Sequence, residues 1–328
     1  MTATRWIGAA LLLAAAAGSS GAQSSLAQTS QAQTWPSKQI EMIIAFPAGS
    51  GVDVIGRAMA AAIAQQAGQN IVVLNRDGAA GTLGFATLAA AAPDGHTLAF
   101  GPTTPIANAP YLVKGVRYNV ESFTYVCQVF ENVFAIAVGP KSKFTSAQDL
   151  FAAAKANPGQ LTYGHAGLGT IPHLSMENTA EALNHKFSAV PFRGDAPLVP
   201  ALLRGEVDFA AAGVSTIRPQ PAIRPLAIFS EKRHPAYPDV PTVKELGVAT
   251  SVPPGHNGLF APRGLSADVR NALERACGAA LKQESVLKVM ANTGQSIEYL
   301  SGADFHAQTV ADYKSKGELI KRLGLGVQ

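Results

Sequence analysis

The sequence predicts an α/β protein whose two lobes enclose a cleft. From residue 39 onward, short apolar runs of strand length alternate with amphipathic helical stretches, which is the pattern of a parallel sheet covered by helices. About 300 residues follow the N-terminal segment, more than one hydrophobic core usually organises. Two segments, 125–138 and 256–261, are the expected crossings between lobes. Two crossings build one lobe from both ends of the chain, as in a hinged clamshell that closes on a ligand.

The first residues predict a secretory signal peptide over 1–27. An apolar run from Trp6 to Ala17 follows Arg5, and candidate signal-peptidase sites follow at 20–22 and 25–27. The run is too short to span a hydrocarbon core of ~30 Å, so a retained anchor is the less favoured alternative. The mature chain is therefore expected to begin near Gln23 or Gln28 and to fold in the periplasm.

The first lobe is predicted to comprise residues 35–128 and 257–328. Its opening β-α-β pattern rests on strand-length apolar runs and on a helix with Ile55, Met59 and Ile63 at helical spacing. A long strand-like passage over 123–138 leads out of this lobe. The expected strands are 39–46, 71–74, 97–100 and 258–261, and the expected helices are 53–67, 82–91, 267–282, 286–291 and 303–323.

The second lobe is predicted to comprise residues 129–256. It begins with a helix over 146–156, which Asn157-Pro158-Gly159 ends. Apolar runs and helical stretches then alternate again, and a segment rich in Pro and Val closes the lobe. The expected strands are 161–164, 187–190, 207–211 and 225–229, and the expected helices are 173–184, 197–204 and a short one at 243–246.

Composition excludes two classes of protein. At 47% hydrophobic and 15% charged residues, the chain can bury large cores and is not disordered. Its formal charge is +4, and its Lys and Arg residues are scattered without interleaved aromatics, so nucleic acid is not an expected partner. The seven His residues are dispersed and form no metal-ligand spacing with cysteine, so no metal is expected.

Cys127 and Cys277 are the only cysteines in the sequence. In an oxidising compartment they could bond, closing a loop of ~150 residues and stabilising the fold by ~4 to 5 kcal/mol. Their local contexts favour the alternative of two buried thiols. Cys127 lies in a strand-like run, and Cys277 shares an apolar helix face with Leu273 and Leu281.

Three strand-to-helix turns are rich in Gly and small hydroxyl residues: 46–53, 78–84 and 164–170. Free N–H groups at helix starts can cradle an anion, and Gly51 is expected to allow positive φ and close approach of a carboxylate. Neither a phosphate loop nor a dinucleotide fingerprint fits their spacing. Ordinary βα connections are the alternative for each turn alone. Taken together, the three turns predict a carboxylate site of main-chain amides and hydroxyls at the carboxyl edge of the strands.

The charged and aromatic residues near these turns can have either structural or functional roles. Asp53 is expected to cap a helix with Arg57 as its partner, and Arg193 is either a bidentate carboxylate contact or a surface group. His165 and His173 are expected to be hydrogen-bonding groups of the third turn, and Phe46 to be core or cleft lining. Catalytic motifs are missing, and Asp53, His165, Arg193 and Asp195 are the candidates for an enzymatic alternative.

Five segments in order carry a family resemblance: 44–57, 75–84, 92–98, 190–194 and 203–208. The first of these segments contains Phe46-Pro47-Ala48-Gly49-Ser50-Gly51-Val52-Asp53. Through the five segments, nearly the whole mature chain resembles the tripartite tricarboxylate transporter solute receptors, or Bug family. The resemblance implies a type II periplasmic binding protein fold, two α/β lobes joined by two crossing strands. It also implies that the turns at 47–53 and 167–170 hold a ligand carboxylate through backbone groups and bridging waters.

Three departures from the family pattern bear on the ligand. Ser50-Gly51-Val52 stands where the family usually has a Gly-Gly pair and Thr, and Arg193 stands where Lys is more common. The segment 210–216 has no acidic side chain to meet an amino group, which disfavours an amino acid. The predicted ligand-binding residues are Phe46, Pro47, Ala48, Gly49, Ser50, Gly51, Asp53, Thr82, Thr103, Gly167, Gly169, Thr170, His173, Arg193 and Gly213.

The resemblance and the turns together predict a solute-binding protein rather than an enzyme. It is expected to act as a monomer, without cofactor, capturing a small carboxylated organic acid for the membrane subunits of a tripartite tricarboxylate-type transporter. A sensory receptor that passes the signal to a sensor protein is the alternative, and an enzyme using the same cleft is a weaker one.

Overall fold

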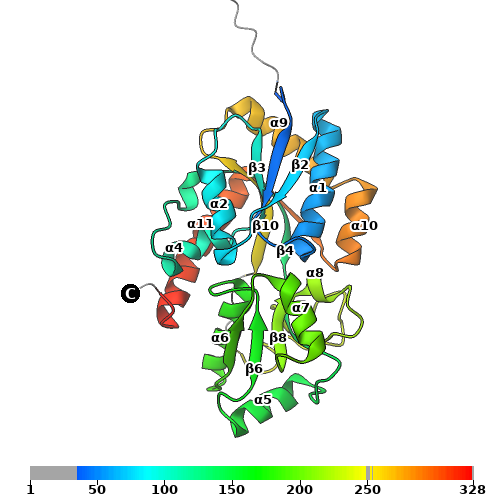
Figure 1. The fold of residues 1–328 in the computed structure, drawn as a ribbon, viewed down its shortest axis with the longest axis vertical. Coiled ribbons are helices and arrows are strands. Elements are labelled where there is room, and N and C mark those ends of the chain that lie inside the picture. The colour runs from blue at the N-terminus through cyan, green and yellow to red at the C-terminus, as the bar shows by residue number, and fades with distance from the viewer. Residues whose placement is uncertain (1–34, 249–251, 253, 327–328) are drawn as a thin grey trace, which may run out of the picture. The chain divides into compact units, whose positions relative to one another are not determined.

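The computed structural model describes residues 35–248, 252 and 254–326, so the predicted signal peptide lies outside the described residues. Within them the strands form a six-stranded sheet, in the order β11-β4-β10-β3-β1-β2, and a five-stranded sheet, in the order β7-β6-β8-β5-β9. Figure 1 shows each sheet with its own helices beside it. The first sheet takes strands from both ends of the described chain, and the second takes strands from its middle.

The opening β-α-β pattern is confirmed in the first sheet. β1 pairs in parallel with both β2 and β3, with Met42 opposite Val73 and Leu98. The helix that follows β1 begins where Ser50 caps it and ends at Gly68 in the left-handed conformation. The N-terminal elements of this lobe are β1 Ile40–Ile44, α1 Gly51–Ala67, β2 Ile71–Asn75, α2 Thr82–Ala89 and β3 Thr97–Pro102.

The predicted strand-like passage over 123–138 is two strands that belong to different sheets. β4 (Phe123–Asn132) lies in the first sheet and β5 (Phe134–Val138) in the second, so the chain crosses at Val133. The return crossing lies between β9 (Arg224–Phe229) and β10 (Gly255–Pro262). The prediction of a crossing over 256–261 was wrong in detail, because those residues pair with β3 and β4 throughout.

Both sheets are mixed rather than parallel. β10 runs antiparallel to β3 and β4, and β5 runs antiparallel to β8 and β9. Strands that follow a crossing enter their sheet from the opposite end, which reverses their direction. In the second sheet β7, β6 and β8 pair in parallel, and β9 runs in the same direction because it and β8 are both antiparallel to β5. Its elements are α5 Ala147–Ala156, β6 Thr162–His165, α6 Ile171–Ala182, β7 Ser188–Pro191, α7 Asp195–Arg204, β8 Phe209–Gly213 and α8 Val214–Ile217.

Each sheet is covered on both faces by apolar side chains of helices. One face of the first sheet packs on α1, α9 (Ala267–Ala280) and α10 (Glu284–Asn292), and the other packs on α2 and α11 (Gly302–Arg322). The second sheet packs on α5 and α6 on one face and on α7 and α8 on the other. The side chains of β5 alternate between the two faces, since Ile136 packs in one apolar cluster while Ala135 and Ala137 pack in the other.

Several short elements differ from the sequence predictions. The predicted helix at 243–246 is a turn, and the edge strand β11 (Ile297–Ser301) was not anticipated. The half-exposed pattern of β11 explains the omission, because edge strands carry little apolar signal. Also unanticipated were α3 Thr104–Ala107, α4 Ala109–Leu112, α8 and the 3₁₀ turns Ala79–Gly81 and Val120–Ser122. Among the helices of the described part of the chain, the length and apolar content needed to cross a bilayer are not met.

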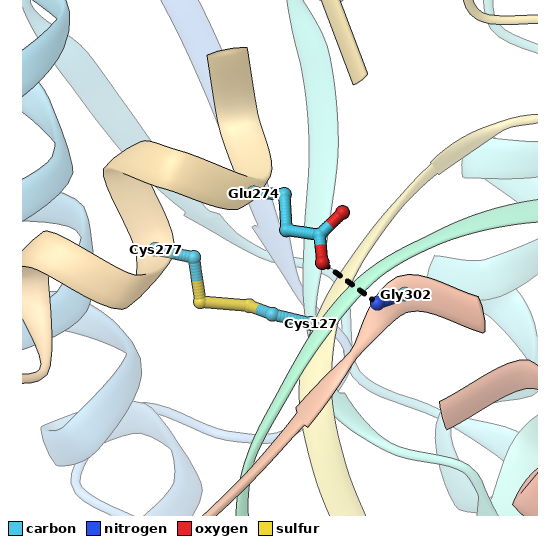
Figure 2. Close-up of a disulfide and its surroundings, with 4 residues drawn as sticks. All are labelled: Cys127, Glu274, Cys277 and Gly302. Carbon is cyan, nitrogen blue, oxygen red and sulfur yellow. Dashed lines mark hydrogen bonds between the residues drawn. A yellow bond between two sulfur atoms is a disulfide. The ribbon is translucent and has the colours of Figure 1, made fainter. Parts of the chain in front are cut away.

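A disulfide joins Cys127 of β4 to Cys277 of α9, so the favoured prediction of two buried thiols was wrong. Both residues are fully buried, which is what their apolar contexts indicated, but the strand and helix faces meet. Figure 2 shows a second tie beside it, in which the carboxylate of Glu274 accepts a hydrogen bond of 3.3 Å from the N–H of Gly302. The α9 helix is therefore fastened to the sheet and to the start of α11.

Candidate functional site

Two neighbouring cavities lie between the strand-to-helix turns of the two sheets. The larger, of about 440 Å³, is lined by the start of the first turn, by the second and third turns, and by a fourth strand-to-helix turn between β7 and α7, at 191–195. The smaller, of about 40 Å³, is lined by the first turn, Thr170 and α8. Phe46 and Ala166 line both cavities. The cavities therefore form at the carboxyl ends of the parallel strands, where the sequence predicted the site.

The first turn is held by hydrogen bonds of its own. The hydroxyl of Ser50 accepts from the N–H of Asp53 at 3.3 Å, and the carboxylate of Asp53 accepts from the N–H of Gly49 at 2.9 Å. Arg57 and Asn75 donate to the same carboxylate at 3.0 and 2.8 Å, so the predicted pairing of Asp53 with Arg57 is confirmed. Burial alone would raise the pKa of Asp53, but these hydrogen bonds outweigh it and lower the pKa.

Gly51 makes the contact between this turn and the second lobe. Its N–H donates to the hydroxyl of Thr216 at 3.3 Å, and a Cβ on Gly51 would lie 2.2 Å from the hydroxyl oxygen of Ser215. The positive φ expected at Gly51 is found instead at Gly49, where φ is 81°. Close approach of the opposite lobe, rather than backbone conformation, is what requires glycine at position 51.

The second turn lines the larger cavity with an unusual backbone. Ala79 and Ala80 both have positive φ, at 46° and 54°, and both line the cavity. Side chains in this region of φ cost energy and are often found at ligand sites. Thr82 begins α2 just beyond the turn and is buried behind it.

The third turn is built around two stacked histidines, His165 and His173, whose rings lie 4.5 Å apart. The N–H of Gly167 and that of Gly169 donate to His165 and His173, at 3.3 and 3.0 Å, so both histidines are the turn-forming groups that were predicted. Thr170 donates its hydroxyl to the carbonyl of Gly167 at 2.7 Å. Burial lowers the pKa of each histidine to about 4, so neither is charged at neutral pH.

The fourth turn places one charged residue at each cavity. Arg193 is exposed and lines the larger cavity, whereas Asp195 begins α7, is buried and lines the smaller one. Of the described residues that line the larger cavity, Arg193 is the one cation at neutral pH, and Asp77 is the one anion. The remaining lining is largely apolar, including Phe46, Leu112 and Phe192. The arrangement can hold a small molecule with an apolar body and an anionic end.

The structure divides the predicted site residues into three groups. Those that line the larger cavity are Phe46, Pro47, Gly167, Gly169, His173 and Arg193. Those that line the smaller cavity are Phe46, Ser50, Gly51 and Thr170. Among the described residues, those outside the linings of both cavities are Ala48, Gly49, Asp53, Thr82, Thr103 and Gly213.

Sequence reasoning missed part of the lining, above all the contributions of β4, α3 and α4, whereas Ser215 and Thr216 of α8 lie in the segment 210–216 that it connected with ligand choice. Asn132 ends β4 and Thr104 begins α3, and both line the smaller cavity. Leu112, Val113 and Leu325 line the larger one from segments without a turn signal. A polar Asn132 inside an apolar strand was the one signal that could have been followed.

The N–H groups of the predicted anion cradle are largely engaged within the protein. Those of Gly49, Gly51 and Gly169 donate to Asp53, Thr216 and His173. A carboxylate bound at Gly51 or Gly169 would have to replace the protein acceptor. Of these acceptors, only Thr216 belongs to the opposite lobe, so only its hydrogen bond would break if the lobes moved apart.

The comparisons with known proteins agree with this architecture. The model of the family described as "Tripartite tricarboxylate transporter family receptor" matches residues 55–325. The chain is 33% identical to the "UPF0065 protein in gbd 5'region" of Cupriavidus necator over 301 residues, which are 90% of each chain.

Three solved structures have the same fold. The periplasmic binding protein BugD is 26% identical, with a TM-score of 0.84 over 90% of this chain and 100% of its own. R. palustris Rpa4515, solved with adipate, is 27% identical, with a TM-score of 0.84 over 89% and 99%. MatC from Rhodopseudomonas palustris, solved with bound malate, is 26% identical, with a TM-score of 0.80 over 87% and 100%. The predicted two-lobed periplasmic binding protein fold is confirmed.

Proposed function

Because the chain belongs to the tripartite tricarboxylate transporter receptor family, we propose that it captures a small carboxylated organic acid between its lobes in the periplasm and presents it to a membrane transporter. The family is one of solute-binding receptors, not of enzymes. The signal peptide predicted over residues 1–27 is part of this proposal, because the ligand and the transporter would meet on the outer side of the inner membrane.

The observation that carries the proposal is the cavity of about 440 Å³ between the turns of the two lobes. Its volume suits a small ligand, and its lining combines an apolar body with the single cation Arg193. Two relatives of the same fold were solved with the dicarboxylates adipate and malate. A short carboxylic acid is therefore the ligand class that the lining favours.

Isothermal titration of the purified protein against di- and tricarboxylates, aromatic acids and amino acids tests the proposal. We expect at least one carboxylic acid to bind, and none of a matched set of uncharged alcohols and amides of the same carbon number. Absence of heat and of thermal stabilisation across all the acids would overturn it.

Arg193→Ala tests whether the cation of the larger cavity pairs with the ligand. The loss of a charged hydrogen bond to a carboxylate should weaken binding by about 1.5 to 3 kcal/mol. Arg233 of the same lobe pairs with Glu245 at the surface, so Arg233→Ala is the control and should bind as the wild type does. Equal affinities of the Arg193→Ala variant and the wild type would place Arg193 outside the ligand contacts.

A further inference from the structure

The carboxylate of Asp195 has one oxygen without a hydrogen-bond partner among the described residues. The residue begins α7 and is 8% exposed. Its Oδ2 accepts from the N–H of Gly213 at 2.9 Å. Its Oδ1 is fully enclosed and unpaired. A buried carboxylate oxygen without a donor is costly and calls for a partner that the protein itself does not supply.

The space beside Asp195 fits one small polar group. Asp195 lines the smaller cavity, whose volume of about 40 Å³ exceeds the ~10–15 Å³ that a cavity needs to hold one water molecule. Hydroxyls of Ser50, Thr104 and Thr216 line the same cavity, and Lys and Arg are absent from its described lining. Phe46 and Ala166 border both cavities, so a ligand in the larger cavity lies next to this space.

We propose that Asp195 determines ligand specificity, by accepting a hydrogen bond from an amino or hydroxyl group that the bound carboxylic acid carries. The preferred ligands are then amino acids or hydroxy acids rather than unsubstituted acids. This inference rests on the proposed function, because it concerns the same ligand. It also revises the expectation drawn from residues 210–216, since the acidic side chain missing from that segment is supplied to Gly213 and Thr216 by Asp195.

A donor on the ligand suits Asp195 in its ionised form, whose Oδ1 accepts no hydrogen bond from the described residues. Burial raises the pKa of Asp195, which favours the protonated acid, and the Gly213 and Thr216 donors oppose that rise only in part, so a donor at Oδ1 would help to keep the carboxylate ionised. A third donor at Oδ1 would complete the hydrogen bonding of the ionised carboxylate. An ammonium group would add its charge, and a hydroxyl group would add the hydrogen bond alone.

Matched acids of one carbon skeleton test the proposal on the wild-type protein. The series are succinate, malate and aspartate; glutarate, 2-hydroxyglutarate and glutamate; and adipate with 2-aminoadipate. In the skeleton that binds most tightly, we expect the substituted acid to have an affinity at least tenfold higher than its parent. A stronger gain for the amino acid than for the hydroxy acid identifies the ammonium group as the donor. Equal affinities of parent and substituted acids would mean that a bound water fills the cavity, and would overturn the proposal.

Asp195→Asn tests the residue itself, because it keeps the side-chain shape and an oxygen for the Gly213 N–H but can present an NH₂ group where Oδ1 lies. We expect the tenfold preference to disappear while the affinity for the parent acid stays within twofold. Asp239→Asn is the control, since Asp239 is an exposed carboxylate of the same lobe and its removal changes the charge equally.

Circular dichroism and thermal melting establish that each variant is folded. A folded Asp195→Asn protein that retains the preference would overturn the role of Asp195. So would an equal loss of affinity for parent and substituted acids. If Asp195→Asn does not fold, the wild-type series alone decides. If no acid in any series binds to the wild type, the proposed function itself fails, which differs from binding without preference.

Discussion

At the scale of single residues, the site depends on contacts that bring the two lobes within bonding distance. Ser50 and Asp53 organise the first turn, and their helix-start pattern could be identified from the sequence. Gly51 of the same turn contacts Ser215 and Thr216 across the cleft. These two residues follow a strand far along the chain, and no local pattern links them to Gly51. Local chemistry was therefore predictable, and the pairing of distant residues was not.

Gly51→Val should abolish ligand binding while leaving the fold nearly intact. Any Cβ at this position would lie 2.2 Å from the hydroxyl oxygen of Ser215, so a side chain holds the lobes apart at this contact. Gly51 is the first residue of α1, and the helix propensities of valine and glycine differ by less than ~1 kcal/mol.

The measurements are titration with the acid that binds the wild type and thermal melting. Gly278→Val is the matched control, because this glycine is also helical and its added Cβ would meet nothing within 4 Å. Wild-type affinity in a folded Gly51→Val protein would show that the lobes do not need to approach here.

At the scale of elements, a buried charge network joins β4, β10 and α11 where the chain returns to the first sheet. His256 lies 3.3 Å from the carboxylates of both Glu131 and Asp312, and Lys316 donates to Asp312 at 2.6 Å. Burial alone would lower the pKa of His256, but the two carboxylates outweigh it and raise the pKa. Asp312 has a lowered pKa because His256 and Lys316 outweigh its burial.

This network predicts that its own contribution to stability falls as the pH rises through neutrality. A histidine whose folded pKa lies above its unfolded value of ~6.5 stabilises the fold fully below that pH and loses the contribution as the folded pKa is passed. His165 and His173, whose pKa is lowered to about 4, add the opposite trend to the whole protein, so the comparison is between the wild type and His256→Gln. The free energy of unfolding in urea, measured at pH 5.5, 6.5, 7.5 and 8.5, should show a wild-type advantage over His256→Gln that declines across the last three values. A pH dependence of His256→Gln identical to that of the wild type would contradict the assignment.

The disulfide between β4 and α9 should contribute strongly to stability. It closes a loop with a sequence separation of 150 residues, which on the chain-entropy model corresponds to about 5 kcal/mol. Urea unfolding of a double Cys127→Ala, Cys277→Ala variant should show a loss approaching that value. Adding a reductant to the wild type should reproduce the loss, whereas adding it to the variant should change nothing. Unchanged stability in both would mean that the cross-link does not constrain the unfolded chain.

Element prediction succeeded where the apolar period was strong and failed where direction or position mattered. β1, α1 and β2 were located within two residues, since buried runs and a capped amphipathic helix are local features. The antiparallel course of β10 was not predictable, because strand direction depends on how the chain returns to the sheet. Short helices such as α3 and α4 each contain a proline in their first turn and too few residues for a periodic signal.

At the scale of the molecule, both apolar packing and polar contacts join the lobes. Ile320 of α11 lies in the hydrophobic core of the second sheet, and Leu112, Leu323 and Leu325 pack against that core. The Asn108 amide donates to the carbonyl of Gly169 at 2.7 Å, and Arg322 of α11 donates to Asn178 of α6 at 2.9 Å. With the Gly51–Thr216 hydrogen bond, they link elements packed on the first sheet to elements of the second. A ligand that contacts both lobes would add to these contacts and favour the closed form.

A saturating ligand should lower the radius of gyration measured by small-angle X-ray scattering, because it favours closure over separation of the lobes. Asn108→Ala should raise the radius of the ligand-free protein by removing one of the contacts between lobes. Identical scattering of the free and saturated wild type would contradict closure. The two bodies to fit follow the boundaries proposed from the sequence, 35–128 with 257–328 and 129–256, moved so that β4 and β10 stay whole in the first body.

The order of the strands along the chain also decides which lobe can be completed first in the proposed export, in which the chain emerges from its N-terminus. The second sheet uses strands only from residues 134–229, so all of its strands would emerge before β10 and β11 reach the first sheet. Cys127 would emerge 150 residues ahead of its partner Cys277. Over that interval β3 would be an open edge, and β4 would lack both of its pairing partners, β10 and β11. The lobe that carries the disulfide would therefore be the last to be completed.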